Sequence, residues 1–103
     1  MKKEEAKRDP VQYRYDILDP DFEELMARIA HYGAEHYGDN NWKKSRLIGG
    51  KSPMNHIRKH YTSYMGETPY DHKEIGDHHS IHLVAIAFNA MMEFYHVKQR
   101  IKS

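Results

Sequence analysis

The sequence predicts an all-α fold, a compact bundle of three main helices with an extended N-terminal lead-in. Three observations favour this class. An N-cap residue followed by proline, a common start of a helix, occurs at Asp19-Pro20 and again at Ser52-Pro53. After both pairs, and again near the C-terminus, apolar residues recur every three or four positions, as on one face of a helix. No segment shows the alternation of apolar and polar residues that is typical of a strand.

The N-terminal residues are expected to lie outside the bundle. Residues 1–10 are mostly charged and lack periodicity, which is typical of a flexible tail. Residues 11–103 then form a single helical domain, since a chain of 103 residues holds one domain at most. We expect residues 11–18 to form an extended lead-in that lies across the helices. Within it, Arg14 and Asp16 either pair with each other or point into a site.

The first two helices have well-marked ends. The first is expected to begin at Pro20, to run to about Tyr37 and to stop at Gly38, because glycine commonly caps a helix C-terminus. The second is expected to span Pro53–Met65 and to be closed by Gly66. A loop rich in basic residues separates the two helices.

The third helix is the most apolar. It is expected to begin after Asp77 or Ser80 and to run to about Lys102, with its apolar residues in one stripe. Asn89 lies in the middle of this segment, and a buried asparagine must find hydrogen-bond partners. It therefore either bridges helices or touches a ligand. Small side chains on this helix would let another helix approach closely: Ala85, Ala87 and Ala90.

Bulk composition excludes several classes of function. Hydrophobic residues make up 39% and charged residues 30%, which suits a soluble domain. No apolar run has membrane-spanning length and no signal peptide is present, so we expect no membrane partner and a cytoplasmic protein, in the host cytoplasm if viral. The absence of cysteine excludes disulfides and thiolate zinc sites. A net charge of +1 and the lack of a recognition-helix pattern argue against nucleic acid as a partner.

The chain is expected to form a homo-oligomer. It is short, and it carries six methionines and eight tyrosines. Small domains bury little apolar surface on their own, so helices of a second copy would cover what one copy leaves exposed. A dimer or tetramer with the site near the subunit contact is expected.

Charged residues divide into a basic and an acidic segment. Residues 40–66 contain six bases and no acid, whereas residues 67–77 contain four acids and one base. Asp71, Glu74 and Asp77 are spaced by three, so on a helical turn they would share a side and suit Mg²⁺ or Mn²⁺. The two segments would then hold a phosphate chain and its metal. Alternatively, they are solvated faces that pair with each other.

Two further patterns have both a functional and a structural explanation. Asn41 and Trp42 follow the glycine-capped end of the first helix, where amides and one aromatic ring suit the wall of a ligand site. Alternatively, Trp42 closes over the core. His56 and His60 lie one helical turn apart, a spacing that can place two imidazoles on one metal but that also occurs in surface or hydrogen-bonded histidines.

Several motifs together resemble a known family. They are Arg14-Tyr-Asp-Ile, Gly33-Ala34, Tyr37-Gly38-Asp-Asn-Asn41-Trp42, His60, Gly66-Glu67, and His82-Leu83 with Asn89. In this order they resemble the phage and bacterial dATP/dGTP diphosphohydrolase N-terminal domain family, often described alongside the all-α MazG-like nucleotide pyrophosphohydrolases. The similarity covers roughly residues 13–95, and Gly-Ala-x-x-Tyr-Gly-x-x-Asn-Trp is its most specific part.

The resemblance implies an activity and a metal. A helical domain of this family would hydrolyse a purine deoxynucleoside triphosphate to the monophosphate and pyrophosphate with a divalent metal. Mg²⁺ or Mn²⁺ would be held by Asp71 and Asp77, with Glu74 as a further ligand, and would activate water. His60 or His82 would serve as ligand or general base.

The basic loop and its surroundings would bind the nucleotide. Four side chains would hold the phosphates: Lys43, Lys44, Arg46 and Lys51. Trp42 or Tyr37 would stack on the base, and Asn41 would read its edge. Arg14 and Asp16 would bind the nucleotide or orient the loop.

A rival hypothesis is a nucleotide-binding protein without catalysis. Ile81 stands where the family pattern has an acidic residue before His-Leu, and Ala85 replaces a frequent histidine. These departures favour a protein that sequesters a nucleotide or a nucleotide signal with the same aromatic and basic residues. A third option, a helical interaction module without a small ligand, explains neither cluster.

Overall fold

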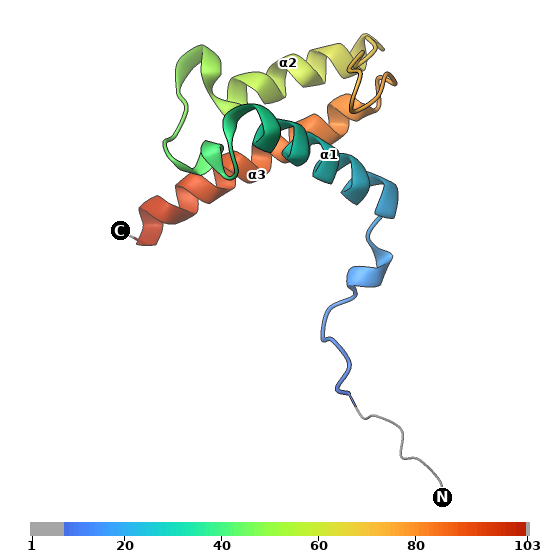
Figure 1. The fold of residues 1–103 in the computed structure, drawn as a ribbon, viewed down its shortest axis with the longest axis vertical. Coiled ribbons are helices and arrows are strands. Elements are labelled where there is room, and N and C mark those ends of the chain that lie inside the picture. The colour runs from blue at the N-terminus through green and yellow to red at the C-terminus, as the bar shows by residue number, and fades with distance from the viewer. Residues whose placement is uncertain (1–7, 103) are drawn as a thin grey trace, which may run out of the picture.

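A computed structural model of the chain describes residues 8–102 and confirms the all-α class. Three α-helices make up most of this part of the chain, in which no strand occurs (Figure 1). The helices are α1 (Pro20–Tyr37), α2 (Pro53–Met65) and α3 (Ile81–Lys102). Three single-turn 3-10 helices lie outside them: η1 (Tyr15–Ile17), η2 (Asn41–Lys43) and η3 (Gly49–Lys51). No helix among the described residues is both long enough and apolar enough to span a bilayer.

Side-chain caps explain the predicted starts of α1 and α2, which the structure confirms. Oδ2 of Asp19 accepts a hydrogen bond from the Phe22 amide at 3.1 Å, and the Ser52 hydroxyl accepts one from the Asn55 amide at 3.1 Å. Each cap satisfies an amide that has no carbonyl partner in the first turn. α1 ends as predicted at Gly38, whose φ of 92° is a conformation that favours glycine.

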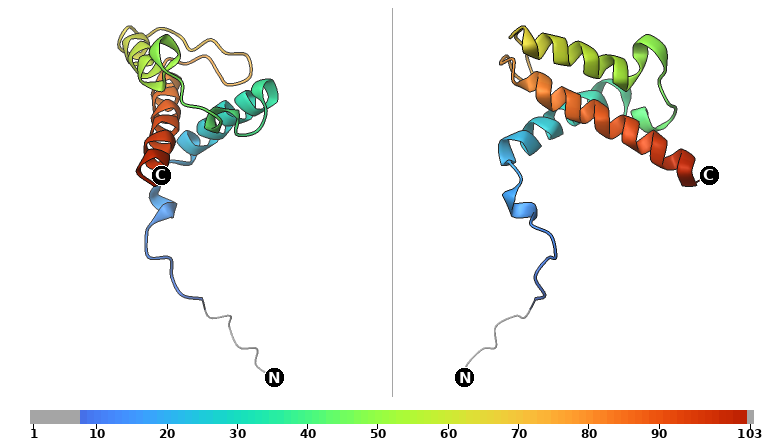
Figure 2. Two further views of the ribbon diagram at one scale, coloured as in Figure 1. Left: turned by 90° about the vertical axis from the view of Figure 1, so that its left-hand side faces the viewer. Right: turned by 180° about the vertical axis from the view of Figure 1, so that it is seen from behind.

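α2 and α3 form an antiparallel hairpin, and α1 crosses one face of it (Figures 1 and 2). Seen from behind, the hairpin lies in front of α1 and no other segment covers it (Figure 2). The core is correspondingly thin. Among the described residues, the buried apolar side chains are Ile75, Ile81, Val84 and Ala85. The core therefore sits at the start of α3, under the loop that connects α2 to α3.

The lead-in differs from the prediction. Of the predicted tail, residues 1–7 lie outside the described residues. From residue 8 to Leu18 the chain leaves the helices instead of lying across them (Figure 1). The N-terminal end of α1 projects beyond the hairpin, so the residues before it have no helix beneath them. Apolar side chains such as Tyr13 and Ile17 are about two-thirds exposed or more. Arg14 and Asp16 pair with each other there.

The loop between α2 and α3 also differs from the expected helical turn. A β-bridge joins His72 to Gly76, and the Tyr70 amide donates to the Asp77 carbonyl at 2.7 Å. The segment is therefore a tight reversal of the chain. Gly76 has φ 145°, and a Cβ there would lie 2.7 Å from Cδ1 of Ile81, so only glycine fits. Asp71, Glu74 and Asp77 therefore do not lie on one side of a helical turn.

Candidate functional site

Two histidines form a hydrogen-bonded pair where α2 and the start of α3 meet. His60 projects from α2 and His82 from the first turn of α3, and their Nδ1 atoms are 2.8 Å apart. Nε2 of His82 lies 3.0 Å from the Thr68 carbonyl oxygen in the α2–α3 loop. His82 is 6% exposed, whereas His60 is half-buried. The antiparallel hairpin therefore brings the two predicted catalytic histidines together.

The hydrogen bonds assign the protons of this pair. A carbonyl oxygen can only accept, so Nε2 of His82 carries a hydrogen and donates it to Thr68. When the pair is uncharged, Nδ1 of His82 accepts and the proton between the rings belongs to Nδ1 of His60. This leaves Nε2 of His60 unprotonated. The two hydrogen bonds, from His82 to Thr68 and from His60 to His82, thus orient Nε2 of His60 as the one unprotonated nitrogen of the pair.

Burial keeps His60 neutral. Burial, followed by electrostatic repulsion from His82, His56 and Lys59, lowers the pKa of His60 to about 4. Each of these effects disfavours the imidazolium form. Nε2 of His60 is therefore an acceptor at neutral pH.

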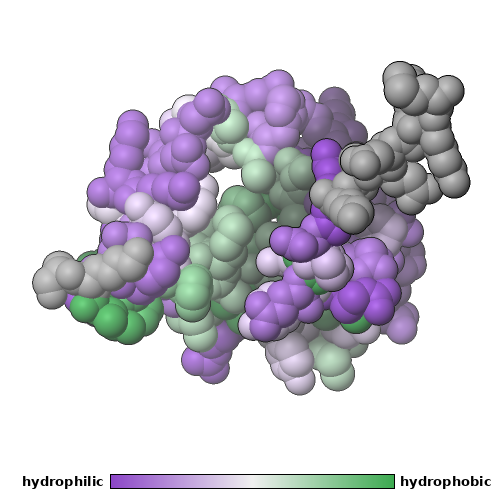
Figure 3. Space-filling view, turned by 90° about the horizontal axis from the view of Figure 1, so that it is seen from below, coloured by the Kyte–Doolittle hydropathy of each residue, from purple (hydrophilic) through white to green (hydrophobic). Residues whose placement is uncertain are grey.

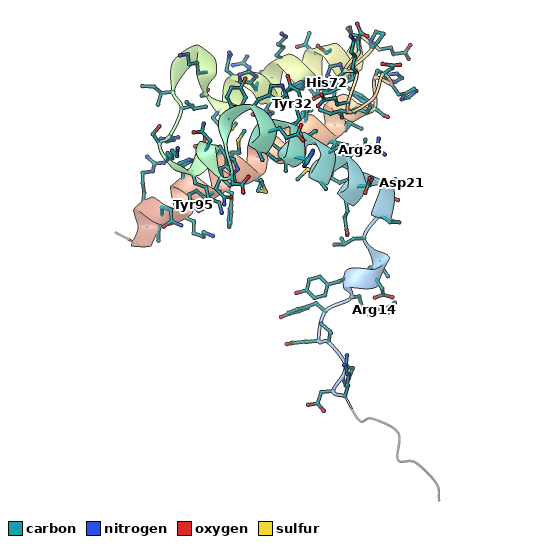
Figure 4. The ribbon with its side chains drawn as sticks, in the orientation of Figure 1. Arg14, Asp21, Arg28, Tyr32, His72 and Tyr95 are labelled. Carbon is teal, nitrogen blue, oxygen red and sulfur yellow. The ribbon has the colours of Figure 1, made fainter. Side chains whose placement is uncertain are left out.

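Aromatic rings surround the pair and extend toward α1. Tyr70 stacks on His60 with a centroid distance of 6.0 Å and meets the edge of His82 at 5.1 Å. Burial raises the pKa of the Tyr70 hydroxyl, which stays a donor. His72 meets Tyr32 of α1 edge-on at 4.4 Å, and Figure 4 shows these two side chains next to each other. Sequence reasoning assigned no role to Tyr70, His72 or Tyr32; the high histidine and tyrosine content was the only signal.

A second cluster lies toward the C-terminal end of α3. Trp42 of η2 meets Tyr95 edge-on at 5.2 Å, and Nε2 of His96 donates to the Trp42 carbonyl at 2.7 Å. Nζ of Lys43 lies 5.3 Å from both the Trp42 and Tyr95 centroids, and Nζ of Lys98 lies 5.6 Å from that of Tyr95. Trp42 is half-buried against α3. Trp42 thus packs on α3, away from the core at the start of that helix, and its ring also borders a cationic surface.

Of the other predicted binding residues, some have structural contacts and some are exposed. Arg46 forms an ion pair with Glu93 of α3 at 2.5 Å and so fastens the loop to the helix. Asn89 is buried and donates to the Ala85 carbonyl of its own helix at 2.9 Å. Four predicted residues are exposed on α1 or the loop: Tyr37, Asn41, Lys44 and Lys51.

One chain does not bring the predicted catalytic and binding residues together. His82 and Tyr95 are thirteen residues apart on α3, which at about 1.5 Å per residue separates the two clusters by about 20 Å. Arg14 lies farther away still, on the lead-in (Figure 4). It is engaged with Asp16 at 2.6 Å, and this pair lowers the pKa of the exposed Asp16 carboxyl.

The predicted metal ligands do not converge in this chain. Asp71, Glu74 and Asp77 are exposed on the α2–α3 loop. Across residues 8–102, no three histidine or carboxylate side chains are placed to hold a metal ion together. The three carboxylates therefore do not form one shared metal site in the described part of the chain.

The chain matches one family model over nearly its whole length. The match spans residues 2–103, and the model is described as "dATP/dGTP diphosphohydrolase, N-terminal". No curated protein and no solved structure gives a significant match. The match confirms the resemblance based on the glycine- and tryptophan-containing motif around Trp42. The chain belongs to the dATP/dGTP diphosphohydrolase N-terminal family.

Proposed function

We propose that the chain hydrolyses a purine deoxynucleoside triphosphate to the monophosphate and pyrophosphate. The family description gives the reaction class. The observation that carries the proposal is the oriented pair of His60 and His82, in which one ring nitrogen is left free to accept a proton. A fixed, neutral imidazole next to a half-buried tyrosine has the unprotonated ring nitrogen that a general base needs, and its pKa of about 4 makes it a weak base at neutral pH.

Each residue of this site has a defined task in the proposal. Nε2 of His60 accepts a proton from the water that attacks the α-phosphorus. His82 holds the ring of His60 in place, and the Thr68 carbonyl fixes the tautomer of His82. The Tyr70 hydroxyl remains protonated and donates a hydrogen bond to a phosphate oxygen. The predicted Mg²⁺ or Mn²⁺ stays a prediction.

The surface around Trp42 supplies the nucleotide-binding part of the proposal. Lys43 and Lys98 lie over its aromatic rings, so a purine edge and phosphate oxygens would meet aromatic and cationic groups together. Lys44 and Lys51 of the same loop add positive charge. This surface alone suffices for the second candidate, a nucleotide-binding protein without turnover. The distance of about 20 Å between the two clusters favours that candidate, because one chain does not join binding to chemistry.

The test is a hydrolysis assay with matched histidine variants. The purified protein is incubated with each deoxynucleoside and ribonucleoside triphosphate in Mg²⁺, in Mn²⁺ and in EDTA, and monophosphate and pyrophosphate are separated by chromatography. His60→Gln should lower turnover at least about 100-fold, as is usual for a general base. His56→Gln, an exposed histidine one turn earlier on the same helix, should retain turnover.

The same assay separates the two candidates. Product from dATP or dGTP that His60→Gln abolishes supports the enzyme. Retention of nucleotide without product supports the binding protein. Equal turnover of the His60 and His56 variants would place the chemistry away from the histidine pair.

A further inference from the structure

The hairpin carries an apolar surface on the face that α1 leaves open. On α3, side chains spaced by three, four or seven positions form an exposed to half-exposed stripe: Leu83, Ala87, Ala90, Phe94 and Ile101. Phe94 is 66% and Ile101 80% exposed. The stripe lies on the side of α3 opposite the buried Ala85 and Asn89. A helix that is apolar on both its inner and its outer side requires cover on both.

α2 continues this surface beside α3. Its outer side chains follow the same helical spacing: Met54, Ile57, Tyr61 and Met65. Tyr61 is 58% exposed. A shallow groove runs between the two helices and is lined by Ile57, Arg58, Tyr61, Thr62 and Ile86. Apolar surface bordered by hydrophilic rims is also visible on the molecule from below (Figure 3).

The exposed area is large enough to include a stable interface. The chain exposes 8849 Å², whereas a compact monomer of its mass, 12.3 kDa, exposes about 6,100 Å². The lead-in contributes part of the excess of about 2,700 Å², and the open face of the hairpin contributes another part. A standard interface buries about 800 Å² on each partner. The excess is therefore sufficient for cover by a second protein of similar size.

The surface complements itself. Phe94 protrudes from α3 four residues after Ala90, and Ile86 lines the groove four residues before Ala90. A two-fold axis through Ala90 would run the two α3 helices antiparallel and place Phe94 of each copy opposite Ile86 of the other. The small side chains of Ala87 and Ala90 allow the helices to approach closely at the crossing.

We propose that the chain forms a two-fold symmetric dimer through this face, with two hairpins packed into a four-helix bundle. Two-fold dimers use the same patch on both subunits, as this ridge and groove require. Antiparallel hairpins of this length are the usual components of four-helix bundles. The inference does not rest on the proposed hydrolysis, because it is argued from exposed apolar side chains and uses neither His60 nor His82.

The first experiment measures mass against concentration by sedimentation equilibrium. The full chain should be a dimer at micromolar concentration, and Phe94→Glu should weaken the dimer by at least about 100-fold, because it places a charge twice in one apolar interface. Ile48→Glu replaces an equally exposed apolar side chain in the loop outside the hairpin and should leave the dimer intact. Circular dichroism checks that both variants keep their helices. A monomeric wild-type chain, or a dimer that survives Phe94→Glu, would overturn the proposal.

The second experiment fixes the register without perturbing the core. The chain contains no cysteine, so a single one can be introduced without background. Ala90→Cys should form a covalent dimer under mild oxidation, because each residue at the axis faces its own copy. Gln99→Cys lies on the opposite side of α3, is exposed, and should not. A dimer that cross-links through Gln99→Cys but not through Ala90→Cys would contradict the proposed face.

Discussion

The two ends of α3 carry aromatic and basic groups in opposite arrangements. At the N-terminal end, His82 is buried, His60 is held neutral, and both are fixed by hydrogen bonds that end on a backbone carbonyl. At the C-terminal end, Trp42 and Tyr95 are half-buried and lysine ammonium groups lie over their rings. The N-terminal end of α3 thus holds a neutral imidazole group, whereas positively charged lysine side chains collect at its C-terminal end.

This difference has a physical basis in the packing. The α2–α3 loop folds over the start of α3 and excludes water, so an imidazolium there loses hydration. At the other end of α3, the described residues that pack on the helix are those of η2 and its loop, and Lys43 there stays exposed and hydrated. A desolvated, oriented base suits chemistry, and a hydrated cationic surface suits the binding of phosphates. The following predictions test whether the two ends divide these tasks.

The largest expected effect is a loss of stability when packing is weakened at the N-terminal end of α3, under the α2–α3 loop. Ile81→Ala removes a buried side chain that contacts Gly76 of the loop, and should lower the free energy of unfolding by about 3 kcal/mol. Ile48→Ala, in the loop near the other end, is exposed and should change it by less than about 0.5 kcal/mol. Urea unfolding followed by circular dichroism measures both. Equal losses would mean that the two ends are packed alike.

The next largest effect is the contribution of His60, at the N-terminal end of α3, to the pH dependence of stability. The unfolded His60 takes up a proton near pH 6.5, but the folded one only near pH 4. The unfolded state thus binds more protons in this window, and stability falls as pH decreases through it. Because His60 is only half-buried, solvent reduces the effect to about 1–2 kcal/mol.

His60→Gln should remove this part of the pH dependence, and His56→Gln should keep it. Urea unfolding at pH 7.5 and pH 5 gives the difference for each variant. The comparison within one helix separates the contribution of His60 from that of the histidines that both variants retain. An unchanged slope in His60→Gln would show that folding does not lower the pKa of His60.

The sequence predicted the helices well because their ends are encoded locally. Asp19 and Ser52 each cap a helix through their own side chain, and Gly38 and Gly66 follow the last residues of α1 and α2. These signals need no tertiary contact. The predicted position of the lead-in was wrong because no local signal determines it. Its position depends on whether the surface of another element lies within its reach.

The site was only partly predictable from sequence. His60 and His82 were predicted separately, but their hydrogen bond depends on the register of the hairpin, which no local pattern specifies. Tyr70 reaches them through a chain reversal that requires φ 145° at Gly76, where the sequence pattern allowed a helical turn. The carboxylates were placed on that helical turn and so were expected on one side. Their convergence on Mg²⁺ or Mn²⁺ therefore remains a prediction without support from the geometry.

A smaller effect is expected on nucleotide affinity at the C-terminal end of α3, where Trp42 meets Tyr95. Trp42→Leu keeps an apolar contact with Tyr95 but removes the flat ring, and should weaken retention of dATP or dGTP about tenfold. Tyr37→Leu is the matched control, because Tyr37 is exposed at the end of α1 and its ring pairs with His36 of its own helix. Equilibrium dialysis gives both affinities. If Tyr37→Leu shows the larger loss, the base stacks at the end of α1 instead.

The smallest expected effect concerns a single charge. Lys43→Gln removes an ammonium group that lies 5.3 Å from two ring centroids, an exposed interaction of about 0.5 kcal/mol, so stability should hardly change. Nucleotide affinity should fall about threefold, and the affinity of the variant should depend less on salt, because one phosphate contact is lost. Lys73→Gln removes an exposed lysine of the α2–α3 loop and should leave affinity and its salt dependence unchanged. A larger loss in Lys73→Gln would assign the phosphates to the histidine end and reverse the division of tasks along α3.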